Sequence, residues 1–186
     1  MSTPLPAVAA RPVQPRLGSV IAAACLLLAI ALPVISLCVA MYDPAVMIEG
    51  LKLPQPQAVS AEDLTLFQRI GLAVLSVIPP LFQSYGLLCA RRCFQSFVRG
   101  EYFARQIVKA LRGFAAGMFF AIVAGFVTTP LLSMLLTLHA GPGQHALMIN
   151  FGSEELLRLL FAGILWQMAA VMLNAVKLAE ENSQFV

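Results

Sequence analysis

Four long apolar stretches dominate the chain, and each is long enough to cross a membrane as a helix. They cover residues 17–42, 70–90, 113–138 and 156–176. A helix needs about 20 apolar residues to span roughly 30 Å of hydrocarbon. The first three stretches contain no charged residue or histidine, and the fourth contains only Arg158. The pattern predicts an all-α fold, an integral membrane bundle of four transmembrane helices.

The remaining segments complete the predicted organisation. Residues 1–16 are rich in proline and should form a flexible cytoplasmic N-terminal tail, whereas residues 17–186 should form a single transmembrane domain. Four prolines inside the spans should kink them, namely Pro33, Pro79, Pro80 and Pro130. Kinks serve as hinges in some transporters, but prolines are also common in ordinary membrane helices. Both interpretations stay open.

Composition supports the membrane class. The chain is 60% hydrophobic and 11% charged, whereas a soluble domain averages roughly 45–50% apolar and about 25% charged residues. These values exclude an ordinary soluble domain and a disordered chain. The formal net charge of +3 is too small to indicate direct nucleic-acid binding.

The placement of basic residues predicts the orientation. Short cytoplasmic loops of membrane proteins carry an excess of Lys and Arg. The N-terminal arm, the loop between the second and third spans and the C-terminal tail hold Arg11, Arg16, Arg91, Arg92, Arg99, Arg105, Lys109, Arg112 and Lys177. The two other loops hold only Lys52, Arg69 and Arg158. Both termini should therefore be cytoplasmic.

The loop between the second and third spans is a candidate binding surface. Phe103, Ile107 and Leu111 recur at helical spacing, and a break at Gly100 should separate them from the preceding helix. We therefore expect a cytoplasmic helical hairpin here. Its candidate contacts for anionic lipid or for a protein partner are Arg91, Arg92, Arg99, Arg105, Lys109 and Arg112. The alternative is that these charges only fix the topology.

Small residues recur every four positions in the third span. They are Gly113, Gly117, Ala121 and Gly125. Such a face lets another helix backbone approach closely. We expect it to pack on a helix of this chain or of a second copy, so a homo-oligomer is possible at this stage.

Candidate chemistry is sparse. The sequence shows no nucleophile motif, no metal-ligand spacing and no phosphate-binding glycine loop, so we expect no catalytic, cofactor or metal site and no enzyme activity. The apolar spans also lack the ionisable groups that ion-coupled carriers keep at membrane depth. A coupled carrier is therefore disfavoured.

From Leu66 onward the chain resembles a bacterial inner-membrane family that is known as domain of unknown function 2975. The matching stretches are 67–71 (FQRIG), 90–94 (ARRCF), 99–103 (RGEYF), 108–113 (VKALRG) and 178–186 (LAEENSQFV). The resemblance implies a four-helix inner-membrane protein. It implies no activity, substrate or site residue, and Ala104 stands where the family often has a capping Ser or Thr.

These features predict a multi-pass membrane protein that regulates or binds a partner, in contact with the lipid bilayer and with another membrane or cytoplasmic protein. Two other classes stay open. One is a small uncoupled transporter or channel, and the other is an immunity-type protein that protects the membrane from a toxin.

Overall fold

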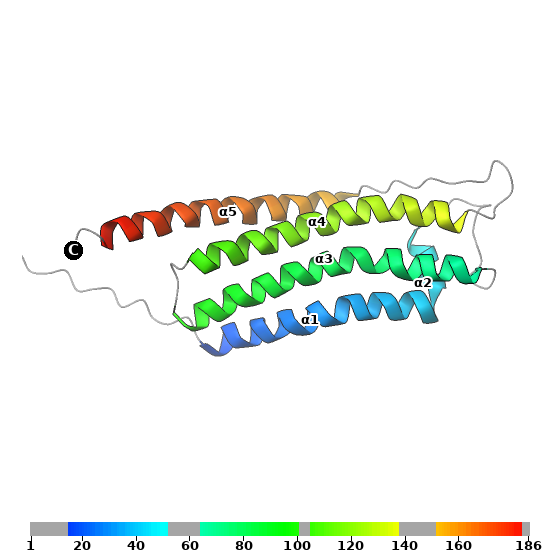
Figure 1. The fold of residues 1–186 in the computed structure, drawn as a ribbon, viewed down its shortest axis with the longest axis horizontal. Coiled ribbons are helices and arrows are strands. Elements are labelled where there is room, and N and C mark those ends of the chain that lie inside the picture. The colour runs from blue at the N-terminus through cyan, green and yellow to red at the C-terminus, as the bar shows by residue number, and fades with distance from the viewer. Residues whose placement is uncertain (1–14, 52–63, 101–104, 138–151, 184–186) are drawn as a thin grey trace, which may run out of the picture.

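The computed structural model describes residues 15–51, 64–100, 105–137 and 152–183. This part of the chain forms five helices and no strands (Figure 1). They are α1 (Pro15–Tyr42), α2 (Pro44–Gly50), α3 (Leu66–Val98), α4 (Arg105–Leu136) and α5 (Ser153–Ser183). Four of them, α1, α3, α4 and α5, are long and apolar enough to span a membrane. The prediction of an all-α chain with four membrane-length helices is therefore confirmed, and the short helix α2 is an addition to it.

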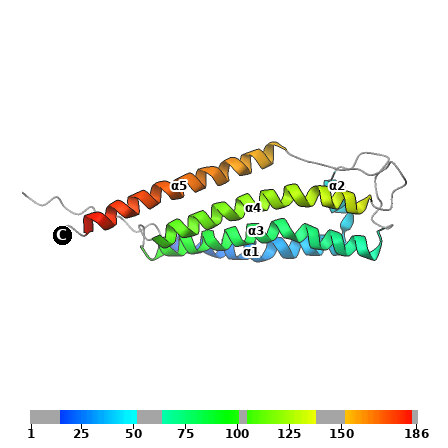
Figure 2. The same cartoon turned by 45° about the horizontal axis from the view of Figure 1, so that its top comes forward.

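The long helices form a row. Helix α3 packs against α1 on one side and α4 on the other, and the main contacts of α5 are with α4. Figure 2 shows that α5 lies close to α4 near its own C-terminal end and moves away from it toward Ser153. Helix α3 is consequently the central element, and α5 is the least embedded one.

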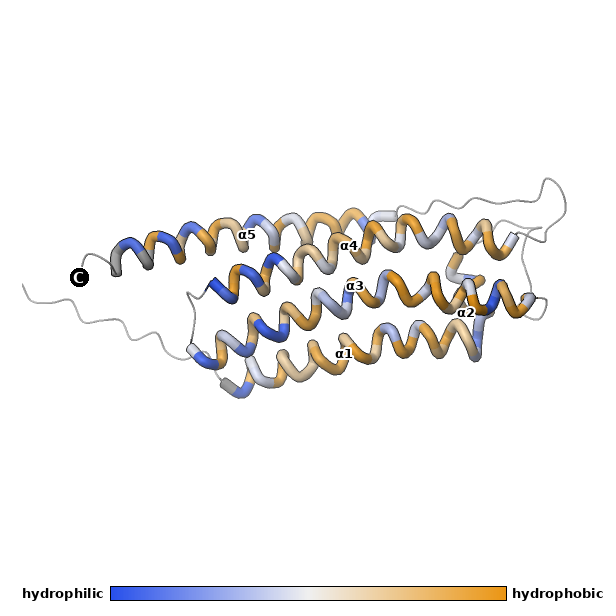
Figure 3. Tube along the Cα trace, in the orientation of Figure 1, coloured by the Kyte–Doolittle hydropathy of each residue, from blue (hydrophilic) through white to orange (hydrophobic). Residues whose placement is uncertain are grey.

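Hydrophilic residues gather at one end of this row (Figure 3). We call it the basic end, because α3 carries Arg91 and Arg92 there, Arg99 follows the last residue of α3, and α4 carries Arg105 and Lys109. Helices α1 and α4 begin at the basic end, and α3 and α5 finish there.

The break that the sequence predicts at Gly100 lies between α3 and α4, and the cytoplasmic hairpin stays a prediction. Helix α3 continues without a break from its apolar part to Val98, and Gly100 then adopts a positive φ of 78° that ends the helical path. The basic residues from Arg105 onward belong to the first turns of α4 itself. No Gly or Pro interrupts α4 between Arg105 and Arg112, so the amphipathic stretch and the span form one helix.

Helix α3 begins with a capping box at Thr65. The Thr65 hydroxyl accepts from the Gln68 backbone N–H, and the Gln68 side chain accepts from the Thr65 backbone N–H. Gln68 is only 2% exposed, and its Nε2 donates to the carbonyls of Leu135 and Leu136, both at 3.2 Å. One side chain thus caps the start of α3 and the end of α4.

In each of α1 and α3, a serine hydroxyl bonds to a backbone carbonyl of the other helix that a proline leaves without its helical partner. A proline has no N–H, so the carbonyl four residues earlier loses its helical partner. Pro33 leaves the carbonyl of Ala29 without one, and the Ser84 hydroxyl of α3 donates to that carbonyl at 2.6 Å. Helix α3 therefore supplies the hydrogen bond to Ala29 that Pro33 removes from α1.

The exchange is reciprocal. Pro80 leaves the carbonyl of Ser76 without its helical partner, and the Ser36 hydroxyl of α1 donates to it at 2.9 Å. Unpaired carbonyls are costly in an apolar environment, and hydroxyls of neighbouring helices commonly satisfy them in membranes. Two prolines that weaken their own helices thus specify how α1 and α3 pair.

Helices α3 and α4 approach each other closely at two glycines. A Cβ atom placed on Gly117 would lie 2.6 Å from the Cα and N of Gly86 and 2.9 Å from the carbonyl oxygen of Phe82. These are backbone atoms, which cannot swing aside as a side chain can. The contact therefore requires glycine at position 117. A Cβ atom placed on Gly125, two turns further along, would meet no atom within 4 Å.

We expect Gly117→Ala to lower the free energy of unfolding by about 1–3 kcal/mol, because the new methyl group forces the two backbones apart. Gly125→Ala is the matched control, since alanine improves helix propensity there by up to about 1 kcal/mol and meets no neighbour. Thermal unfolding of both variants in one detergent measures the difference. Equal melting temperatures for the two variants would contradict the close contact.

Candidate functional site

The six predicted contact residues at the basic end do not form one stripe. Arg92, Arg99 and Lys109 line one hollow between α3 and α4. Arg91 lies on the other side of α3 and lines a second hollow against α1, to which Arg99 also contributes. Arg112 faces α5, and Arg105 is exposed at the start of α4. Lys109 and Arg112, which both belong to α4, thus have different neighbours.

The hollow between α3 and α4 concentrates positive charge. It has a volume of about 420 Å³. Three cationic side chains line it, together with three neutral polar side chains (Gln95, Ser96 and Gln106) and, toward the apolar part of the helices, Tyr85, Cys89 and Ala110. None of the described residues that line it is acidic. We call this hollow the basic groove.

Small residues of α4 allow the close contact with α3 beside the basic groove. Gly113 lies directly beneath it, where a Cβ would come within 2.6 Å of the Cys89 sulfur of α3. Gly117 and Ala121 are buried further along, and Gly117 meets Gly86. At Gly125, the fourth member of this face, an added Cβ would meet no atom within 4 Å, and this residue lines a different hollow. The helix that packs on the small-residue face is α3 of the same chain.

Helix α5 is anchored near the basic end. The guanidinium carbon of Arg112 lies 5.7 Å from the centre of the Trp166 ring, which is a cation–π distance. Val108 of α4 forms a buried cluster with Ala169 and Val176 of α5. These contacts fix the register of α5 against α4.

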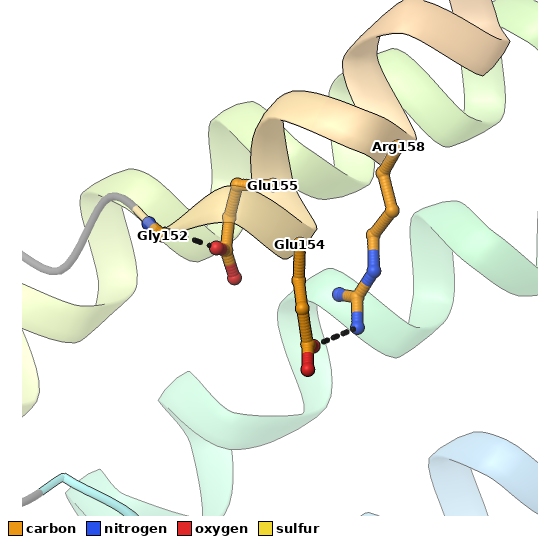
Figure 4. A network of polar contacts seen from close by, with 4 residues as sticks. All are labelled: Gly152, Glu154, Glu155 and Arg158. Atoms are coloured by element: carbon orange, nitrogen blue, oxygen red, sulfur yellow. Dashed lines mark hydrogen bonds and ion pairs between the residues drawn. The ribbon is translucent and has the colours of Figure 1, made fainter.

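A consequence of this register is a polar hollow beside the middle of α3 and α4. It has a volume of about 160 Å³ and brings Glu155 and Arg158 of α5 together with Gln83 of α3 and Thr129 of α4. Figure 4 shows the charged residues: Arg158 pairs with Glu154 at 3.3 Å, and Glu155 accepts from the Gly152 N–H at 3.0 Å.

The sequence did not reveal this polar hollow. The sequence places Arg158 at the border of the fourth apolar stretch, next to one of the two loops that should lie outside the cytoplasm. In the structure α5 begins beside the middle of α4 and not beside its end (Figure 1). The contact between Arg112 and Trp166 fixes the position of α5 along α4, and the spacing from Trp166 to Arg158 then fixes where Arg158 lies. The sequence alone does not reveal this contact.

Comparison of the chain with protein-family models, with curated proteins and with solved structures gives no match. The resemblance described above therefore stays a prediction, and the geometry of the basic groove carries the functional argument.

The register of α5 is open to a direct test. In a chain whose four native cysteines are replaced by alanine, we expect Val108→Cys and Ala169→Cys to form a disulfide on mild oxidation, because these two residues belong to one buried cluster. The control pairs Ala169→Cys with Ile122→Cys, which lies about 21 Å further along α4. A disulfide in the control pair alone would place α5 in another register. Gel mobility of the oxidised chain with and without reductant measures both.

Proposed function

We propose that this protein is a non-catalytic, multi-pass protein of the bacterial inner membrane whose basic end faces the cytoplasm. The nine-to-three division of basic residues supports this orientation. In it, both termini and the connection between α3 and α4 are cytoplasmic. The bilayer covers the exposed apolar side chains of α1, α3, α4 and α5.

We further propose that the protein is regulatory and acts by docking an acidic group in the basic groove. The single observation that carries this proposal is the convergence of Arg92, Arg99 and Lys109 on one hollow without an acidic partner among the described lining residues. Like charges repel at close range, so an anion that binds among them is attracted by all three. Charges that served only to orient the chain would have no need to share one hollow.

The test compares two variants that each lose three positive charges. Arg92→Gln/Arg99→Gln/Lys109→Gln removes the charge of the basic groove, and Arg11→Gln/Arg16→Gln/Lys177→Gln removes the same charge elsewhere on the same side. We expect affinity purification from native membranes to lose its associated acidic component, protein or lipid, only with the groove variant. If the groove variant recovers as much of the acidic component as the wild type does, the proposal is contradicted.

Orientation has to be verified in the same samples, because removing basic residues can invert a membrane protein. Single cysteines at Ser60 and Ser183 serve for this. In intact cells, an impermeant thiol reagent should label Ser60→Cys and should not label Ser183→Cys. The opposite labelling would contradict the proposed orientation independently of the docking result.

A small uncoupled channel is the second candidate, and the polar hollow favours it. Glu155, Arg158, Gln83 and Thr129 offer polar groups at a depth where they are rare and usually functional. Reconstituted liposomes separate the candidates, since a channel gives ion or solute flux above that of empty vesicles and Gln83→Leu reduces it.

A further inference from the structure

We infer that the basic groove binds the phosphate headgroup of an anionic phospholipid, with an acyl chain lying along α3. The inference rests on the proposed membrane location and names the acidic group that docks. It starts from where the groove stands. Arg92 is the second residue after the apolar part of α3, so the groove spans the boundary between apolar and charged residues. A bilayer places its phosphate groups at that boundary.

The donors in the groove suit a phosphate group. The Arg92 and Arg99 guanidinium groups can each present paired N–H donors, and Lys109 adds a compact positive charge from the facing helix. Gln95, Ser96 and Gln106 supply neutral donors around them. Basic pockets between membrane helices on the cytoplasmic side are a common form of headgroup site.

An apolar path leads away from the groove. Leu81, Tyr85, Leu88 and Arg92 follow one another at helical spacing, so they share a face of α3. Leu81 is 53% exposed and Leu88 is 39% exposed, and Tyr85 lines the deep end of the groove. A molecule with a phosphate at Arg92 and a hydrocarbon chain directed along α3 fits both parts. A soluble anion or an acidic peptide would use only the charged part.

The experiment measures lipid retained by the purified protein. The full chain in neutral detergent is incubated with phosphatidylglycerol or phosphatidylcholine of the same acyl chains, and bound lipid is counted by native mass spectrometry. We expect the wild type to retain phosphatidylglycerol in preference. Arg92→Gln/Lys109→Gln should lower its affinity by about thirtyfold, since each Lys or Arg near an anionic surface contributes roughly fivefold.

The control variant, Arg16→Gln/Lys177→Gln, loses the same charge at the same end and should retain the lipid as the wild type does. Equal retention of the two lipids would overturn the inference, as would equal loss in both variants. An excess of inorganic phosphate separates a lipid site from a free-anion site, because full displacement by phosphate alone overturns the lipid assignment. Melting temperatures of both variants in lipid-free detergent verify that neither is misfolded.

The outcome is separable from that of the proposed function. If the groove triple variant loses a protein partner while phosphatidylglycerol binds no better than phosphatidylcholine, the lipid inference fails and acidic docking stands. If phosphatidylglycerol is retained specifically but the native-membrane preparations of wild type and groove variant are identical, the regulatory docking role fails and the lipid site stands.

Discussion

The arrangement of the helices depends on two hydrogen bonds between α1 and α3. In each, a serine of one helix donates to a carbonyl that a proline of the other helix leaves without its helical partner. In an apolar environment, the carbonyls that Pro33 and Pro80 release need donors. Ser84 and Ser36 provide them across the same interface and in opposite directions. A shift of α1 along α3 by a single turn would remove both hydroxyl donors together, so this pair sets the register of the two helices. The prolines act here as specificity elements, and the bonds argue against a free hinge at these positions.

Fixing α1 on one side of α3 leaves the other side for α4. There the register depends on backbone contact, since Gly86 and Gly117 meet without intervening side chains. At the far end, Gln68 joins the start of α3 to the end of α4 through two carbonyls. The basic groove is a consequence of these constraints. Arg92 and Lys109 share one hollow because the contact between Gly86 and Gly117 brings the two helices together about two turns away.

Much of the fold could be predicted from local sequence. The apolar stretches gave the four long helices, because the cost of exposing backbone polar groups to lipid is large and the required length is set by the membrane. The break at Gly100 followed from the freedom of glycine to adopt positive φ. The face of Gly113 and Gly117 indicated close helix contact, although its partner, α3, could not be read from α4 alone.

What could not be predicted depends on pairs of distant residues. A proline shows which carbonyl it releases, but nothing in α1 says that Ser84 supplies the donor. The basic residues looked like one amphipathic face, yet their division between the groove and Trp166 depends on how three helices are placed. The position of α5 was missed for the same reason. Its apolar stretch fixed its length, whereas Arg112 and Trp166 fix its depth.

The most direct measurement is a double-mutant cycle between Pro33 and Ser84, followed by unfolding in one detergent. Ser84→Ala alone should lower the free energy of unfolding by about 0.5–2 kcal/mol, because the Ala29 carbonyl loses its donor. In a Pro33→Ala background, the N–H of residue 33 can donate to that carbonyl, so the cost of Ser84→Ala should largely disappear. If Ser84→Ala is equally costly in both backgrounds, the exchange between prolines and serines does not hold the helices in register.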